Sequence, residues 1–371
     1  FKSRALTLIS TLLMIYALCN YTLAQLKAMG AADEGITDGG VPSAYGIIFL
    51  AIIMVIYETL GGMRSVAWTD VIQGVVLLVG FSIILILVPQ LGGGFSEVVE
   101  RLYLIDPDKL TVPEWTGTNK WLSYVVLLGC GAAIYPQAIQ RLYASRSIKV
   151  LKRSLSWMAF MPLTTTLIAL VCGVTAIVVL PEIKEGRSDQ VLARLLALIM
   201  AGSELGYWLV VAVFAAALAA LMSTADSALL SISSMFTRDI YLPYFRPDSS
   251  ESHLTWVGKI FSWIMVAVLV YVAIVTDKTL VRLLELKFEV LIQVVPSFFF
   301  GLYWKRLQSR TAIVGLVAGL VVALVLWWLG YSTFWGFHAG VIGLFVNCSI
   351  CFFSTYFLSE NFVKAGDTNR A

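Results

Sequence analysis

Long, continuous runs of apolar residues constrain the fold of this chain more than any other feature. A membrane-spanning helix needs roughly 20 mostly apolar residues, and ten runs meet or approach that length. They cover residues 5–26, 42–60, 69–89, 120–139, 155–180, 206–235, 254–275, 280–303, 311–329 and 337–358. The sequence therefore predicts an all-α polytopic membrane protein with about ten transmembrane helices.

The loops and the composition favour a single membrane domain over residues 1–371. Short loops separate the runs and leave no room for a separate soluble domain. Charged residues make up 13% of the chain, whereas soluble domains usually carry about 25%. A transmembrane β-barrel would show alternating segments of about 10 residues, and these runs are continuous.

Basic residues in the loops predict the orientation of the helices, because cytoplasmic loops carry an excess of Lys and Arg. The stretch RLYASRSIKVLKR (141–153) holds five basic residues and no acid, and YWKRLQSR (303–310) holds three and no acid. The loop GAADEGITDGGVP (30–42) holds three acids and no base. These loops predict a multi-pass protein of the plasma (inner) membrane with both termini of this chain cytoplasmic. The net charge of +3 belongs to this pattern and does not indicate nucleic acid as a partner.

The run 120–139 contains an interruption. Gly129, Gly131 and Pro136 fall within eight residues of one another in LLGCGAAIYPQAIQR (127–141). Glycine loosens a helix, and proline removes a backbone donor and clashes with the preceding turn. Interrupted helices form substrate and ion sites in secondary transporters, but an ordinary packing kink gives the same pattern.

Hydroxyl side chains gather in AALMSTADSALLSISS (219–234), inside another apolar run. At 100° per residue, one helix face carries Ala220, Ser223, Thr224, Ser227, Ser231 and Ser234. A face of small residues is common at helix interfaces in membranes, but adjacent hydroxyls and a carbonyl also supply part of the oxygen shell that sodium prefers. Asp226 lies on the far side and is interpreted as a packing or salt-bridge residue.

Four motifs, in order along the chain, resemble the sodium/solute symporter family. YETLGGMRSVAWTDVIQ (57–73) is similar to a loop of the family's first repeat, and YPQAIQR (135–141) to its proline-glutamine-arginine signature. LAALMSTADSALL (218–230) with RDIY (238–241) resembles its sodium-site helix. QVVP (293–296), GLYWKR (301–306) and GLVAG (315–319) resemble later helices. The sodium/proline, pantothenate and monocarboxylate symporters are the most similar members.

This resemblance implies an incomplete fold of two inverted five-helix repeats with an interrupted helix. Residues 1–89 would form the last three helices of the first repeat, 120–303 the second repeat, and 311–358 two additional C-terminal helices. The missing N-terminal helices of the same protein supply further sodium and solute contacts in the family. The chain also begins without Met. We therefore expect residues 1–371 alone not to transport until the upstream helices are supplied.

The resemblance also implies a sodium site. The family's ligands match Ala220, Ser223 and Thr224, and an aspartate tied to cation dependence matches Asp70. Considered by itself, Asp70 could equally cap a helix together with Thr69.

Candidates for the solute pocket lie near the interruption and in the run 280–303. They are Gly129, Gly131, Tyr135, Gln137, Glu289 and Gln293. Ionisable residues inside a membrane are functional candidates by default. Glu285 and Glu289 are one turn apart with Lys287 on another face, and the alternative role of the two acids is an internal pair with Lys or with Arg282.

The function implied is secondary active transport by alternating access. Sodium would be co-transported with a small organic solute, such as an amino acid, a monocarboxylate or a vitamin-like compound, across the lipid bilayer, with no organic cofactor. The alternative is the membrane input domain of a histidine kinase-type receptor, which needs a kinase region after Leu358, where only SENFVKAGDTNRA follows. An enzyme is not expected, because H-E-x-x-H is absent and GGGF (92–95) lacks the Lys-Ser/Thr of a phosphate loop.

Overall fold

The structure is a computed structural model that describes residues 1–60, 63–182 and 185–367. For residues 57–58, 63–67, 185–187 and 357–367 it describes the backbone but not the side chains. The described residues form helices, apart from one short antiparallel pair of strands near residue 335. The first half of the chain contains α1 (Arg4–Ile36), α2 (Ser43–Leu60), α3 (Met63–Gln90), α4 (Phe95–Ile105), η1 (Pro107–Leu110), α5 (Trp115–Ala133), α6 (Pro136–Tyr143), α7 (Ile148–Met158), α8 (Met161–Val179) and η2 (Glu185–Gln190). The second half contains α9 (Val191–Gly202), α10 (Glu204–Met235), η3 (Phe236–Tyr241), α11 (Leu242–Tyr244), α12 (Glu251–Val275), α13 (Leu280–Leu291), η4 (Ile292–Val294), α14 (Val295–Tyr303), α15 (Ser309–Trp328), β1 (Thr333–Phe334), β2 (Phe337–His338) and α16 (Ala339–Asp367).

Hydroxyl N-caps fix where several of these helices begin. Ser203 precedes α10 and accepts a hydrogen bond from the backbone N–H of Gly206 at 2.9 Å. Ser250 and Thr279 cap α12 and α13 in the same way. A capping hydroxyl satisfies a backbone donor that has no partner within the helix, so each cap sets the starting point of a long apolar helix.

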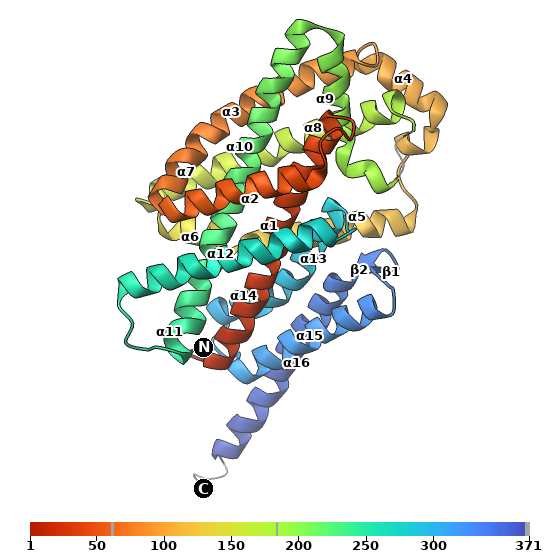
Figure 1. Cartoon of the computed structure of the whole chain (residues 1–371). Coiled ribbons are helices and arrows are strands. Elements are labelled where there is room, and N and C mark those ends of the chain that lie inside the picture. The colour runs from red at the N-terminus through yellow and green to blue at the C-terminus, as the bar shows by residue number, and fades with distance from the viewer. Residues whose placement is uncertain (61–62, 183–184, 368–371) are drawn as a thin grey trace.

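Helix α1 is the central helix of the bundle, and Figure 1 shows it running diagonally between the other elements. Its first half packs with α13–α16 in one apolar core, which includes Leu18. Its second half packs with α2, α10 and α12 in another, which includes Leu26. A third core joins α3, α8, α9 and α10. Helix α1 thus joins the C-terminal helices to the helix that carries the hydroxyl residues.

Helices α3 and α10 approach each other closely. A Cβ added at Gly80 would lie 2.5 Å from the Cβ of Ala216, so the two backbones meet through glycine and alanine. Ala216 continues the small-residue face of α10, so this part of the face serves close helix packing, as small residues commonly do in membranes.

By length and composition, seven helices of the described residues can each cross a membrane, or eight when the bent pair α5–α6 counts as one span. Ten spans were predicted, and two of them differ in the structure. The apolar part of α2, Ser43–Ile56, is a shorter helix. The run 280–303 is divided into α13 and α14 by the 3-10 turn η4. Pro296, at the start of α14, has no backbone donor and accounts for that division.

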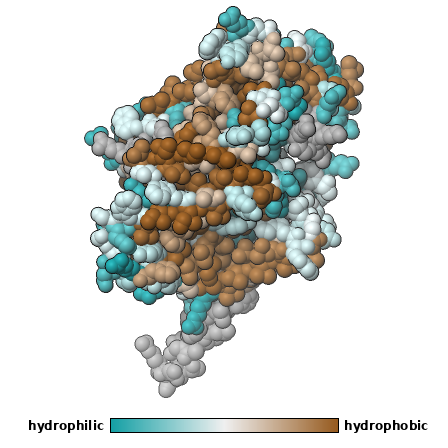
Figure 2. All heavy atoms as spheres, viewed as in Figure 1, coloured by the Kyte–Doolittle hydropathy of each residue, from teal (hydrophilic) through white to brown (hydrophobic). Residues whose placement is uncertain are grey.

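An apolar exterior agrees with a bilayer as the surrounding solvent. Large side chains such as Leu60, Trp68 and Leu104 are more than 60% exposed. Figure 2 shows apolar residues across the middle of the visible face and hydrophilic residues towards its edges. The chain is therefore an all-helical, multi-pass membrane protein.

Candidate functional site

The hydroxyl face of α10 contacts α3 and α6 through polar side chains. Ser223 Oγ donates to Asp70 Oδ1 on α3 at 2.5 Å. Arg141 on α6 donates through Nη2 to the hydroxyl of Ser227. Ser231 Oγ lies 3.0 Å from Gln140 Oε1, also on α6. The face predicted from the helical period is thus a polar contact between three helices.

Asp70 lies at the centre of this contact. Its second carboxylate oxygen accepts a hydrogen bond from Arg141 Nη2 at 2.6 Å. Asp70 is well inside α3, which begins at Met63, so the alternative of a helix N-cap shared with Thr69 is wrong. The side chain of Asp70 is 19% exposed and that of Arg141 is 48% exposed. We name Asp70, Arg141, Ser223 and Ser227 the α10 cluster.

The three predicted sodium ligands, Ala220, Ser223 and Thr224, are all half-buried on α10. The hydroxyl of Thr224 lies near that of Tyr21 of α1. Together with the Ser223–Asp70 bond, this places oxygen atoms from α1, α3 and α10 around one short stretch of helix. Part of the motif YETLGGMRSVAWTDVIQ, including Gly61 and Gly62, lies outside the described residues.

The predicted interruption is present as a bend of 41° between α5 and α6. Tyr135 is the N-cap of α6 and is 8% exposed, and its hydroxyl lies near that of Tyr21 but forms no hydrogen bond of standard geometry among the described residues. Oε1 of Gln137 is likewise buried without a described partner. Gly131 faces the interior, where an added Cβ would lie 2.4 Å from the Phe288 ring. Gly129 faces open space on the exterior, so the structure does not bring it to the other candidates.

A second charged group lies on α13. Arg282 Nη1 pairs with Glu285 at 2.9 Å and with Glu289 at 3.0 Å. Glu289 is fully buried and also accepts hydrogen bonds from Trp327 Nε1 at 2.8 Å and from the backbone N–H of Gly340 at 3.0 Å. The sequence offered an internal pair with Arg282 as one role for Glu285 and Glu289, and the structure contains this pair.

Other helices complete this group. Tyr124 of α5 donates to Glu285, and His338 Nε2 lies 3.5 Å from Glu285 Oε1. We name Tyr124, Arg282, Glu285, Glu289, Trp327 and His338 the α13 cluster. Gln293 is fully buried beside it and donates to the carbonyls of Glu289 and Gly340. Glu289 and Gln293 therefore form their polar contacts with α13, α15 and the residues around α16. Neither forms a polar contact with the break between α5 and α6 among the described residues.

Lys287, on another face of α13, is 3% exposed. Its ammonium nitrogen lies 3.6 Å from the ring centre of Tyr21, 4.9 Å from that of Tyr135 and 4.1 Å from that of Phe288. In the sequence, this lysine stands out only as a neighbour and possible pair partner of the two glutamates. A lysine in an apolar run is itself a signal for a functional site. By contrast, the pairing of Arg141 with Asp70 had no local signal in the sequence.

Comparison with known proteins adds to this geometry. Residues 1–319 match the sodium:solute symporter family. The chain belongs to that family. This confirms the resemblance carried by the four motifs and places the chain among membrane transporters rather than enzymes.

Several curated relatives are similar over most of the chain. The uncharacterized symporter YhjB of Bacillus subtilis is 24% identical over 86% of this chain and 65% of its own length. The sodium/glucose cotransporter of Vibrio parahaemolyticus is 27% identical over 86% of this chain and 64% of its own length. The sodium/pantothenate symporter of Haemophilus influenzae is 27% identical over 91% of this chain and 69% of its own length. The chain thus spans about two thirds of the length of these relatives.

A solved structure shares the fold. It is a Na⁺-coupled sialic acid symporter in a substrate-bound outward-open state, with a TM-score of 0.72 and 21% identity. The match covers 94% of this chain and 74% of the other. The helical arrangement described above is therefore that of a symporter fold.

Proposed function

We propose that this protein is a secondary active transporter that couples sodium entry to the symport of a small organic solute by alternating access. The observation that carries the proposal is the bond between Ser223, on the hydroxyl face of α10, and Asp70, close to the broken helix α5–α6. Membership of the family supports coupling to sodium. Relatives named for glucose and pantothenate transport support an organic solute.

In this proposal, sodium binds the carbonyl oxygen of Ala220 and the hydroxyls of Ser223 and Thr224. Hard cations prefer oxygen ligands, and this stretch of α10 presents two adjacent hydroxyls. The carboxylate of Asp70 lies 2.5 Å from Ser223 Oγ and supplies negative charge beside them. Arg141 holds the other oxygen of Asp70, so one oxygen of the carboxylate faces α10. Asp70 therefore couples cation binding to the contact between α3, α6 and α10.

The solute binds at the break between α5 and α6. A break within a membrane leaves backbone groups that need partners, and discontinuous helices hold substrates in many transporters. The buried hydroxyl of Tyr135 and the buried side-chain oxygen of Gln137, which form no hydrogen bond of standard geometry among the described residues, support this position. Gly131 contributes by admitting the ring of Phe288.

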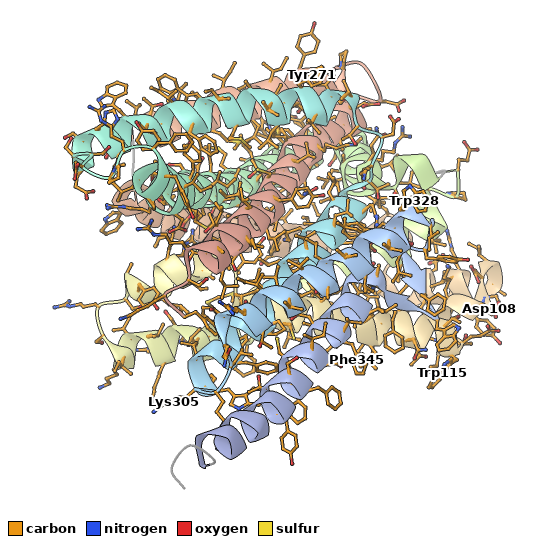
Figure 3. All side chains as sticks on the ribbon, turned by 90° about the horizontal axis from the view of Figure 1, so that it is seen from below. Asp108, Trp115, Tyr271, Lys305, Trp328 and Phe345 are labelled. Carbon is orange, nitrogen blue, oxygen red and sulfur yellow. The ribbon has the colours of Figure 1, made fainter. Side chains whose placement is uncertain are left out.

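The proposed topology has ten spans, with α2 and the α13–α14 pair crossing the membrane in addition to the spans that length alone supports. Residues 1–89, 120–303 and 311–358 form the end of the first repeat, the second repeat and the two extra helices. Figure 3 shows Lys305 at one end of the bundle and Asp108 and Trp115 at the opposite end. This separation supports opposite sides of the membrane for the loops that hold Lys305 and Asp108, and we propose that the basic side, with both termini, is cytoplasmic at the plasma membrane.

The sodium gradient supplies enough free energy for substantial accumulation. One charge moving through 100 mV releases about 2.3 kcal/mol, and a tenfold sodium gradient adds about 1.4 kcal/mol. Since each 1.4 kcal/mol corresponds to a factor of ten, one ion supports roughly 500-fold accumulation of a neutral solute.

The test is uptake by the full-length protein in proteoliposomes, with glucose, pantothenate, proline and pyruvate as probes and with sodium or potassium outside. The double variant Ser223→Ala, Thr224→Ala should raise the sodium concentration for half-maximal uptake at least tenfold. Ser82→Ala is the matched control, because this α3 hydroxyl is exposed and bonds only to its own helix. An unchanged sodium half-saturation in the double variant would contradict the proposed ligands.

A further inference from the structure

Lys287 is a buried lysine with no ion-pair partner among the described residues. Its side chain lies in α13 and is 3% exposed. Within the described part of the chain, its ammonium group forms no hydrogen bond and no ion pair. The ammonium group contacts three aromatic rings. The two acids on the same helix are unavailable, because Arg282 pairs with both Glu285 and Glu289. A buried charge without a counter-charge is costly.

Three aromatic side chains form a cage around the ammonium group of Lys287. The rings of Tyr21 and Tyr135 meet edge to face with their centres 5.5 Å apart, and the Phe288 ring lies on the side of α13. Aromatic faces attract an ammonium group and hold it in position. They carry no formal charge, so an anionic ligand would supply the counter-charge that Lys287 lacks among the described residues.

Two further features of the cage suit an anion. The hydroxyl of Tyr135 is buried near that of Tyr21 and forms no hydrogen bond of standard geometry among the described residues, and its ring centre lies 4.9 Å from Lys287 Nζ. Tyr135 is also the N-cap residue of α6, and no side chain caps that helix. The N-terminus of a helix favours negative charge. A planar carboxylate has two oxygens and can accept from the lysine ammonium and from the tyrosine hydroxyl at once.

We propose that Lys287 binds the carboxylate group of the transported solute, with Tyr135 as a second donor to that group. This inference rests on the proposed function and narrows its solute to a small organic acid or an amino acid. The cage also lies beside the proposed sodium site, because the ring of Tyr21 lies over Lys287 and its hydroxyl lies near that of Thr224. A carboxylate at Lys287 and a sodium ion at Thr224 are thus linked through one residue of α1.

The experiment measures uptake of pyruvate, proline, pantothenate and glucose by the full-length protein in proteoliposomes. Wild-type protein should take up at least one of the three carboxylates and should not take up glucose. Lys287→Met should reduce kcat/KM for that carboxylate at least 100-fold, and Lys287→Arg should retain part of the uptake because it keeps the charge. Lys259→Met is the matched control, since Lys259 donates to the carbonyl of Thr59 and lies on α12.

A second variant tests the second donor. Tyr135→Phe keeps the ring and removes the hydroxyl, and it should raise KM for the carboxylate about tenfold while the sodium half-saturation changes little. If Lys287→Met does not insert into the membrane, the comparison of Lys287→Arg and Tyr135→Phe with wild type decides the assignment. Unchanged KM values in both of these variants would contradict it.

Other outcomes separate this inference from the proposed function. Sodium-driven uptake of glucose without uptake of any carboxylate would overturn the role of Lys287 and leave the symporter proposal standing. Carboxylate uptake that is independent of sodium but is lost in Lys287→Met would support Lys287 and overturn the coupling. A requirement for chloride over sulfate in the buffer, absent in Lys287→Met, would show that the lysine holds an inorganic anion and would overturn the carboxylate assignment.

Discussion

The α10 cluster and the α13 cluster each place an arginine between helices, with one carboxylate in the α10 cluster and two in the α13 cluster, and they differ in how fully those charges are satisfied. In the α13 cluster, the fully buried Glu289 has Arg282, Trp327 and the backbone of Gly340 as partners. In the α10 cluster, Asp70 is partly exposed and has Arg141 and one hydroxyl as partners. A saturated, buried network fixes an arrangement of helices, whereas a partly exposed one made of hydroxyls and a single carboxylate can exchange a partner for a cation.

One helix pair takes part in both clusters. Tyr124 of α5 donates to Glu285 of the α13 cluster, and Arg141 of α6 donates to Asp70 of the α10 cluster. The bend of 41° between α5 and α6 lies between these contacts. A change of partner at Asp70 therefore acts on α6, while α5 remains attached to α13.

The largest effect expected from this comparison is on stability. Glu289→Ala should destabilise the protein by about 3–5 kcal/mol, because the donors of Trp327 and Gly340 lose their buried acceptor and Arg282 keeps only Glu285 as a described ion-pair partner. Loss of thermal stability in detergent measures the effect, and Glu97→Ala is the control, since Glu97 forms an exposed pair with Arg101. Equal stability of the two variants would show that the α13 cluster is not a fixed network.

Closer to the bend, Gly131→Ala should lower the free energy of unfolding by about 1–3 kcal/mol, because the added methyl group overpacks the contact with Phe288. Gly129→Ala, two residues away, meets open space and should be neutral or slightly stabilising, since alanine favours a helix over glycine. The unfolding temperatures of this pair measure the difference. A larger loss in Gly129→Ala would contradict the orientation of α5.

The smallest of the three effects concerns sodium alone. Asp70→Asn should raise the sodium half-saturation of uptake about tenfold, equivalent to ~1.4 kcal/mol, with little change in stability because the amide still accepts a hydrogen bond from Arg141. Asp108→Asn, in the exposed helix η1, should change neither quantity. Glu289→Gln should lower stability and leave sodium half-saturation unchanged, and the opposite pattern would show that the roles of the two clusters are reversed.

Local patterns predicted much of this arrangement. The helical period placed Ser223, Ser227 and Ser231 on one face, and Pro136 marked the bend. The one-turn spacing of Glu285 and Glu289, with Arg282 nearby, indicated an internal pair. Each of these predictions depends on residues close together in the sequence, where helix geometry fixes their relative positions.

Features that depend on tertiary packing could not be predicted in this way. Arg141 and Asp70 are 71 residues apart, and no periodicity links α3 to α6. The direction of Lys287 depends on where α1 places Tyr21. The hydropathy pattern also predicts one span for residues 280–303, because the apolar composition continues through the 3-10 turn that precedes Pro296.

The central claim is that Ser223 and Thr224 hold sodium next to Asp70, and equilibrium binding of ²²Na⁺ to the purified full-length protein tests it most directly. Wild-type protein and Ser82→Ala should bind sodium with the same affinity. The double variant Ser223→Ala, Thr224→Ala should bind at least tenfold more weakly while keeping its unfolding temperature close to that of wild type. Sodium binding of unchanged affinity in the folded double variant would contradict the claim.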